Sequence, residues 1–238
     1  MVTSKLPLRS TSNRFVSFMG ILYQLVVGIL FALTPESWRY KDIRGQTVLI
    51  TGSGSGIGQL MAVKFAQLGC RVVLWDVNEA GMRETVKMIK EKKLDVNMVH
   101  SYRVNLASRE EIYSTAQKVQ SEVGVVDVLV NNAGVVSGAY FLDTLDEKNQ
   151  LTFDVNVLAH FATIKCFLPE MIKQKRGHIV TTASVAGHIG AIRMVDYCAS
   201  KFANVGMVMA LRNELAQANL DAYIKTTTVK PYLITTGE

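Results

Sequence analysis

The stretch TVLITGSGSGIG, residues 47–58, has the pattern of a buried strand that runs directly into a glycine-rich turn. The β-branched run at 47–51 predicts the strand, and a helix is expected to begin near Ile57. Glycines in such a turn allow a sharp bend, close approach of the backbone to a pyrophosphate, and close packing of helix on strand, while the helix N-terminus points at the phosphates. We therefore expect a dinucleotide to contact Gly52, Ser53, Gly56, Ile57 and Gly58.

An acidic residue, Asp76, ends the next β-branched run, 18 residues after Gly58. At that place in a nucleotide-binding unit, a carboxylate accepts hydrogen bonds from the adenosine ribose hydroxyls and repels a 2′-phosphate. The sequence therefore favours NAD over NADP as the cofactor. A plain turn-forming role at the strand end is the alternative for Asp76.

Beyond this turn, short β-branched runs alternate with longer amphipathic stretches, which is typical of a parallel sheet covered by helices on both faces. The predicted strands are 47–51, 71–75, 100–104, 126–131, 178–182 and 224–229, and the predicted helices lie near 57–68, 79–92, 108–123, 146–173 and 195–216. The fold class is thus α/β, a doubly wound parallel sheet of the Rossmann type in three α/β/α layers. We assign residues 45–238 to this domain.

The first 44 residues form a separate segment with a hydrophobic helix. From Phe15 to Leu33 there are 19 residues without a charge, enough for about 28 Å of helix, which is close to the thickness of a bilayer's hydrocarbon core. Basic and aromatic residues flank this stretch on both sides. A membrane anchor is favoured over a cleaved signal peptide, because the apolar core is long and the cleavage site is poor. Orientation stays open, although the chain has no N-x-S/T acceptor, which favours a cytosolic domain.

Charge, cysteine and histidine usage exclude several functions. The net charge of +6 is scattered without a long basic run, so nucleic-acid binding is not expected. Three cysteines without paired spacing indicate reduced thiols, and four histidines without ligand spacing give no reason to expect a metal.

Tyr197 and Lys201 lie four residues apart in YCASK, on one face of a predicted helix. A surface pair is the ordinary explanation for a tyrosine and a lysine at this spacing. The other motifs argue against it: TGxxxGxG, NNAG at 131–134, the lone Asn156 in FDVNVLAH, and Ser184, which precedes Tyr197 by 13 residues. Together and in this order, from about Gly45 onward, these motifs make the chain resemble the classical short-chain dehydrogenase/reductase family.

The resemblance implies a catalytic set of Asn156, Ser184, Tyr197 and Lys201. Tyr197 would exchange a proton with the substrate oxygen, which Ser184 would orient, while Asn156 would hold a water that links the lysine to solvent. Lys201 would bind the nicotinamide ribose. A free phenol is a poor base near neutrality, so we also expect the Lys201 ammonium to lower the pKa of Tyr197.

The resemblance also implies further cofactor contacts and a substrate class. The additional contact residues would be Asn105, Asn132, Gly134 and Thr236, with Asn105 standing where the family usually has aspartate. The sequence around these motifs is similar to that of the membrane-associated retinol dehydrogenase and 17β-hydroxysteroid dehydrogenase branch of the family. That similarity implies a lipophilic alcohol, a location at the endoplasmic reticulum and/or lipid droplets, and a homodimer formed through the helices 108–123 and 146–173.

Family members continue beyond the position of Glu238, so a C-terminal strand and a substrate lid are expected to be missing. Two alternatives stay open at this point. One is an NADPH-dependent carbonyl reductase, and the other is a catalytically impaired membrane or lipid-droplet protein that retains the fold.

Overall fold

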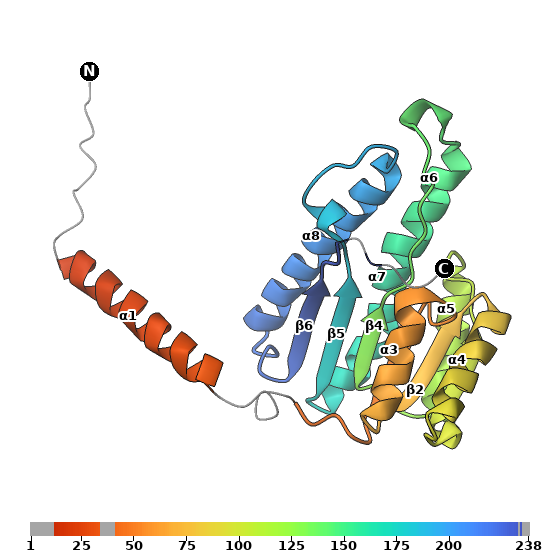
Figure 1. Cartoon of the computed structure of the whole chain (residues 1–238), viewed down its shortest axis with the longest axis horizontal. Helices are drawn as coiled ribbons and strands as arrows, with labels where there is room; N and C mark the ends of the chain where they lie inside the picture. The colour runs from red at the N-terminus through yellow and green to blue at the C-terminus, as the bar shows by residue number, and fades with distance from the viewer. Residues whose placement is uncertain (1–11, 34–40, 233, 235–238) are drawn as a thin grey trace. The chain divides into compact units, whose positions relative to one another are not determined.

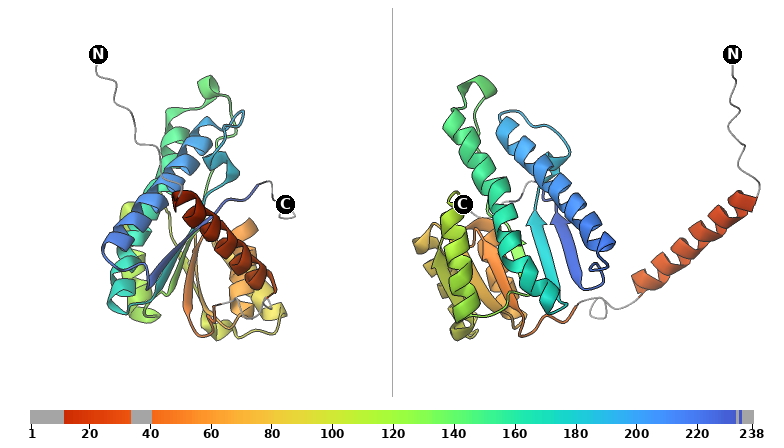
Figure 2. Two further views of the ribbon diagram at one scale, coloured as in Figure 1. Left: turned by 90° about the vertical axis from the view of Figure 1, so that its left-hand side faces the viewer. Right: turned by 180° about the vertical axis from the view of Figure 1, so that it is seen from behind.

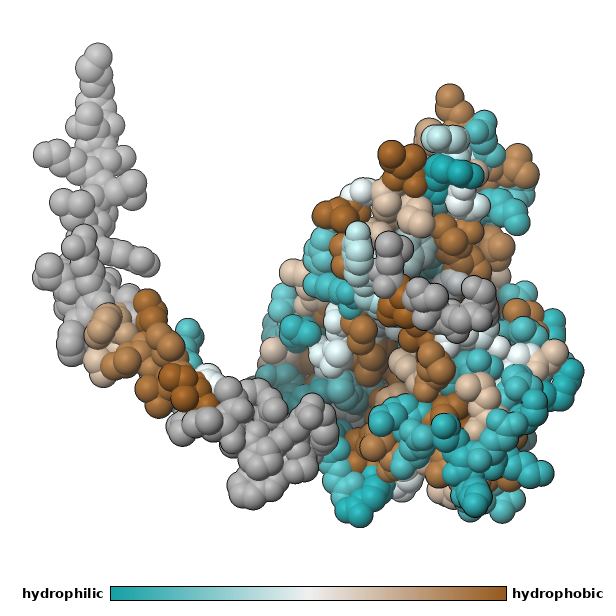
Figure 3. Space-filling model, viewed as in Figure 1, coloured by the Kyte–Doolittle hydropathy of each residue, from teal (hydrophilic) through white to brown (hydrophobic). Residues whose placement is uncertain are grey.

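The structure is a computed structural model that describes residues 12–33, 41–232 and 234. The chain divides into two compact units, Met1–Asp42 and Ile43–Glu238. In the first unit, helix α1 spans Ser12–Leu33. Its described side chains, those of residues 18–29, are exposed and mostly apolar, as the brown surface of this helix in Figure 3 shows.

The second unit is built on a parallel sheet of six strands in the order β3-β2-β1-β4-β5-β6 (Figure 1). This order starts in the middle and winds outward in both directions, as in a doubly wound nucleotide-binding fold. The strands are β1 Thr47–Thr51, β2 Arg71–Asp76, β3 Val99–Arg103, β4 Val128–Asn131, β5 Gly177–Thr182 and β6 Ile224–Val229.

Helices cover both faces of the sheet, which gives the three predicted layers (Figures 1 and 2). One face carries α3 Gly56–Gln67 and α4 Glu79–Glu91. The other carries α5 Arg109–Glu122, α7 Ala159–Lys173 and α8 Val195–Gln217, with the short α6 Asp146–Phe153 extending α7. Side chains alternate along β1 between the two cores: Val48 and Ile50 pack under α3 and α4, while Leu49 packs under α5 and α7.

The predicted fold class is confirmed, and the strand boundaries lie within two residues of those expected. The structure differs most at the helix predicted over 146–173. There α6 and α7 are separated by a π-turn, η3, which spans Asp154–Leu158 and contains Asn156. Single π-turns inside helices are frequent at functional sites.

Among the described residues, one continuous helical segment, Asp146–Lys173, is long and apolar enough to cross a membrane by length and composition. Of its most apolar 18 residues, 56% are buried inside the domain, so this stretch belongs to the core of the fold. Within α1, the described apolar stretch Phe18–Ile29 is shorter than the 18 residues required of a candidate membrane span.

Candidate active site

A cavity of about 940 Å³ lies along the carboxyl ends of the parallel strands. Its walls come from the segments that follow all six strands, together with the first turns of α8. This is the edge at which doubly wound sheets bind their ligands, where the strand order reverses between β1 and β4. Its volume lies within the usual range of small-molecule and cofactor sites.

The glycine turn closes one end of the cavity and leaves no room for side chains. Gly52 has a φ of +67°, and a Cβ there would lie 2.8 Å from the Cα of Ala133. A Cβ on Gly58 would collide with the carbonyl oxygen of Gly52. The amino terminus of the twelve-residue helix α3 therefore opens directly into the cavity, where its unpaired N–H groups can hold phosphates.

Two polar residues fix the backbone around this turn. Asn132 donates from Nδ2 to the carbonyl of Thr51 at 3.1 Å and to that of Gly52 at 3.3 Å, so it ties β4 to the turn. Asp76 accepts hydrogen bonds at 2.8 Å from the backbone N–H of Gly54 and of Asn78. Its carboxylate is therefore held at the end of β2, on the cavity wall.

Most of the predicted cofactor residues line this cavity: Gly52, Gly56, Ile57, Gly58, Asp76, Asn105, Asn132, Gly134, Tyr197 and Lys201. Ser53 does not. Its hydroxyl is fully buried behind the turn and donates to the carbonyl of Trp75, so the cavity gives its predicted cofactor contact no support. Thr236 lies outside the described residues. Ser55, which the sequence reasoning passed over inside the same turn, lines the cavity.

Asn105 uses its side chain in a local turn, in which Oδ1 accepts a hydrogen bond from the N–H of Ala107 at 3.0 Å. The amide oxygen, which would stand in for the family's usual carboxylate, is therefore already engaged. A second lone pair is still free to accept a bond from a ligand.

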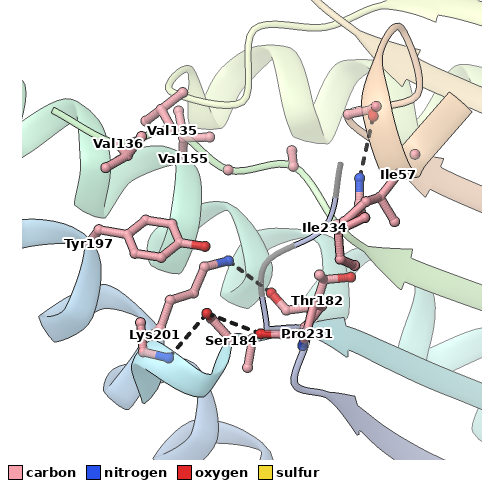
Figure 4. Close-up of a pocket in the computed structure, with 18 of the residues that line it drawn as sticks. Ile57, Val135, Val136, Val155, Thr182, Ser184, Tyr197, Lys201, Pro231 and Ile234 are labelled. Carbon is pink, nitrogen blue, oxygen red and sulfur yellow. Dashed lines mark hydrogen bonds between the residues drawn. The ribbon is translucent and has the colours of Figure 1, made fainter. Parts of the chain in front are cut away.

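Tyr197 and Lys201 project from the first two turns of α8 into the same space (Figure 4). The Lys201 ammonium lies 5.2 Å from the centroid of the Tyr197 ring and donates to the carbonyl of Thr182 at 2.9 Å. Lys201 is only 2% exposed. Burial lowers the pKa of this lysine to about 8.

The pKa of Tyr197 is raised, mainly because the phenol is partly buried, while a hydrogen bond with Ser184 offsets part of the increase. The prediction that Lys201 lowers this pKa is therefore wrong for the protein as the structure describes it. The physical reason is burial of the phenol, which disfavours its charged form and is the largest cause of the shift. The ammonium lies over the ring face and bonds to a β5 carbonyl. Tyr197 is thus a protonated phenol near neutral pH.

Ser184 stands where β5 gives way to the short 3-10 turn η4, Val185–Gly187. Its hydroxyl accepts a hydrogen bond from the N–H of Ala186 at 3.1 Å and makes a long contact of 3.5 Å with the carbonyl of Pro231 (Figure 4). Ser184 and Tyr197 therefore present two hydroxyls to one point in the cavity.

Asn156 does not line the cavity but supports its wall from the π-turn η3. Its Oδ1 accepts from the N–H of Val135 at 2.8 Å, and its Nδ2 donates to the carbonyl of the same residue at 2.9 Å. Its own carbonyl accepts a hydrogen bond from Nδ2 of Asn204. The amide thus holds the loop that follows β4. The water predicted to connect Asn156 with the lysine stays a prediction.

The sequence reasoning missed two buried polar residues near this site. His160, one turn beyond Asn156, is 1% exposed, and neither ring nitrogen has a hydrogen-bond partner in good geometry among the described residues, although Asn204 lies beside the ring. Asp196 directly precedes Tyr197 and is 6% exposed. His160 lies in the FDVNVLAH motif and Asp196 directly precedes the YCASK motif. The spacing of residues in a motif does not show which of them are buried.

Comparison with known proteins agrees with this geometry. The family profile described as "short chain dehydrogenase" matches residues 46–238. Human epidermal retinol dehydrogenase 2 is 43% identical over 97% of this chain and 73% of its own length. Human estradiol 17-beta-dehydrogenase 11 is 48% identical over 90% of this chain and 72% of its own length.

Solved structures show the same fold. A short chain dehydrogenase/reductase from Burkholderia phymatum in complex with NAD superposes with a TM-score of 0.77 at 31% identity, covering 83% of this chain and 69% of that one. A metagenomic short-chain oxidoreductase in complex with NADP gives a TM-score of 0.73 at 30% identity, covering 80% of this chain and 84% of that one. The chain belongs to the short chain dehydrogenase family and is an oxidoreductase related to retinol and 17-beta-hydroxysteroid dehydrogenases.

Proposed function

We propose that this protein is an NAD-dependent oxidoreductase that interconverts a lipophilic alcohol, retinol-like or a hydroxysteroid, and its carbonyl. One observation carries the proposal. The hydroxyls of Tyr197 and Ser184 and the ammonium of Lys201 face the same cavity whose far end is the glycine turn and Asp76. A dinucleotide bound along that cavity would run from the carboxylate to the tyrosine.

The residues that would hold the cofactor fit a dinucleotide without a 2′-phosphate. The close backbone packing at Gly52 and Gly58 supports a pyrophosphate site at the amino terminus of α3. Lys201 lines the cavity beside Tyr197, which supports its proposed contact with the nicotinamide ribose. Asp76 is anchored by two backbone N–H groups and faces the cavity, where it would repel a second phosphate. Thr236 and Asn105 stay predicted contacts.

The chain's own groups supply proton transfer and orientation. Tyr197 exchanges a proton with the substrate oxygen, and Ser184 binds the same oxygen and fixes its position. Lys201 donates to the Thr182 carbonyl and supports the ribose, while Asn156 keeps the adjoining loop in place. A bound nicotinamide supplies the hydride acceptor or donor.

The walls beside Tyr197 favour a lipophilic substrate. Aliphatic side chains that are at least one third exposed line the same cavity: Val135, Val136, Leu151, Ile189 and Ile192. Such a surface binds a hydrocarbon skeleton through burial of apolar area and offers few groups to a sugar or an acid. The names of the retinol and estradiol dehydrogenase relatives agree with this substrate class.

The state of the tyrosine also supports a second candidate, reduction of a carbonyl. A protonated Tyr197, kept so by burial, is the form that gives a proton to a carbonyl oxygen. A carbonyl reductase that uses NADPH is disfavoured only by Asp76. The experiment below therefore tests the direction of the reaction and the choice of cofactor together.

We also propose association with the membrane of the endoplasmic reticulum and/or lipid droplets, with the catalytic domain in the cytosol. The apolar, exposed helix α1 supports the membrane association. The surface shared by α5 and α7 supports a homodimer. It presents Phe161 of α7, 45% exposed, and the adjoining Leu158 at the end of η3, 52% exposed, beside the charged Arg109 and Lys165.

The test is turnover by the full-length protein in purified membranes. Retinol and several hydroxysteroids are offered with NAD⁺ and NADP⁺, and the corresponding carbonyls with NADH and NADPH. We expect turnover with the non-phosphorylated cofactor. The variant Tyr197→Phe should reduce the rate by about 10²- to 10⁴-fold. Because it removes only the hydroxyl, it should weaken NADH binding much less.

Two further results separate the alternatives. Asp76→Asn keeps an oxygen for the Gly54 N–H but removes the charge, so it should narrow the preference for NAD over NADP. Binding of dinucleotide with no turnover across the whole substrate panel would contradict the enzymatic proposal and support the non-catalytic alternative.

A further inference from the structure

Asp196 is a buried carboxylate in the first turn of α8, next to Tyr197, and is only 6% exposed. Its oxygens accept hydrogen bonds from the hydroxyl of Ser137 at 2.8 Å and from that of Thr152 at 2.7 Å. Two backbone bonds, involving Ser137 and Tyr197, add to these. A carboxylate satisfied by four donors is a fixed part of the fold and not a solvated surface charge.

The four donors come from three separate parts of the domain. Ser137 lies in the loop that follows β4, Thr152 lies on α6 and is 1% exposed, and Tyr197 begins the reactive face of α8. Asp196 is therefore the point at which this loop, α6 and the start of α8 are joined.

The loop after β4 is also a wall of the active-site cavity. Val135 and Val136 line the cavity on the side across from Tyr197 (Figure 4). Asn156 holds this loop at Val135 through two hydrogen bonds, and Asp196 holds it two residues further on, at Ser137. The hydrogen bonds at Val135 come from the π-turn η3, and the one at Ser137 comes from α8, the helix that carries Tyr197.

We propose that Asp196 is a positioning residue that locks the Val135–Ser137 wall of the cavity to the first turn of α8, and thereby sets the place of the Tyr197 hydroxyl relative to bound substrate. This inference rests on the proposed function of the same site. Asp196 itself does not line the cavity, so it acts through Tyr197 and the loop.

The charge state of Asp196 explains why it can do this. Burial by itself raises the pKa of the carboxyl, but the hydrogen bonds from Thr152, Ser137 and the backbone lower it below its ordinary value. The group therefore stays an anion, which can only accept hydrogen bonds. Both hydroxyls must then point at it, which fixes their rotamers and the loop that carries Ser137.

The experiment compares Asp196 with a second buried carboxylate at the opposite end of the sheet. Asp127 is 5% exposed and bonds the N–H of Thr47 at 2.9 Å and the guanidinium of Arg176 at 2.7 Å, before β4 begins. Asp127→Ala thus removes a similar set of hydrogen bonds far from the cavity. This control variant shows how much the loss of a buried carboxylate lowers stability when the active-site cavity is not affected.

In the full-length protein we expect Asp196→Ala to lower kcat by about 10- to 100-fold, because small displacements of reacting groups cost that much. The affinity for NADH should stay within about twofold of wild type. Asp196→Asn, which keeps one acceptor oxygen, should recover part of the loss. Asp127→Ala should lower the melting temperature but leave kcat within about twofold.

A second measurement needs no turnover and so separates this inference from the proposed function. Hydrogen–deuterium exchange of the peptide covering residues 133–140 should become faster in Asp196→Ala and stay unchanged in Asp127→Ala. Equal exchange of this peptide in both variants, or equal losses of kcat, overturns the inference. Absence of turnover in the wild type, with faster exchange in Asp196→Ala, refutes the proposed function and leaves the tie in place.

Discussion

Lys201 places a positive charge in a nearly solvent-free position, and that has a cost for folding. Its pKa is lowered by burial from 10.5 to about 8, so the unfolded chain binds the proton more tightly than the native one. The cost is fully present below pH 8 and disappears as the pH rises toward 10.5. At about 1.4 kcal/mol per pKa unit, it is on the order of 3 kcal/mol.

We therefore predict that Lys201→Met increases the free energy of unfolding at pH 7, while turnover is lost. The gain over wild type should shrink when urea unfolding is repeated at pH 10. The exposed Lys64→Met is the control and should show no such pH-dependent gain. A Lys201→Met protein less stable than wild type at pH 7 would show that the bond to the Thr182 carbonyl outweighs the burial of charge.

His160 makes a related prediction at acid pH. Its pKa is lowered to about 3, first by burial and second by the charge of Lys201, with a smaller opposing effect of Asn204. Below pH 6.5 the histidine is protonated in the unfolded chain but stays neutral in the native protein. The free energy of unfolding therefore falls as the pH drops from 6.5 toward 3, by up to about 1.4 kcal/mol per pH unit.

The variant His160→Gln removes this titration, and its unfolding free energy should depend less on pH between 6.5 and 4.5 than that of wild type. Urea unfolding at three pH values within that interval measures the difference. His188→Gln, at an exposed histidine against Phe202, leaves the buried ring in place and should keep the wild-type slope. Identical slopes for wild type and His160→Gln would contradict the prediction.

At the scale of elements, the surface formed by α5 and α7 predicts how the chain associates. Phe161 is half-exposed on α7 in a shallow hollow shared with Tyr113 of α5. If two copies meet there, Phe161→Arg brings like charges into an apolar contact and should convert a dimer to a monomer, as measured by light scattering. Phe202→Arg, similarly exposed on α8, is the matched control and should leave the mass unchanged. A wild-type monomer at micromolar concentration refutes the dimer.

The elements differ in how far sequence could predict them. The strands β1 and β6 begin and end where their β-branched runs do. All five residues of β1 are buried, and burial on a parallel sheet selects such residues. In the edge strand β6 only Ile224 is buried, so its β-branched residues reflect strand propensity instead. The π-turn at Asn156 was beyond sequence reasoning, because the bonds around it come from residues distant in the chain, Val135 and Asn204. The predicted shift of the Tyr197 pKa had the wrong sign for the same reason: spacing puts two groups on one face but does not say how deeply they are buried.

At the scale of the whole molecule, the chain combines two units that need different surroundings: a domain that folds in water and an apolar helix that needs a lipid or protein partner. The domain has its own core, to which Ile43 already contributes, whereas the described side chains of α1 are mostly apolar and are exposed. Exposed apolar area of this kind is stable only against lipid or another protein. Membrane association should therefore reside in the segment before residue 41, and the fold in the segment after it.

The last prediction follows from this division. A chain that begins at Lys41 should leave the membrane fraction and keep the melting temperature and NADH affinity of the full-length protein. Full-length Leu22→Arg, which places a charge costing roughly 3 kcal/mol in the apolar stretch, should show partial release. Because retinol dissolves in the bilayer, the shortened chain should turn it over poorly from vesicles, yet act normally on a short, water-soluble alcohol. Sedimentation with vesicles and rates on both substrates measure this. Retention of the shortened chain on vesicles would assign membrane binding to the domain and contradict the prediction.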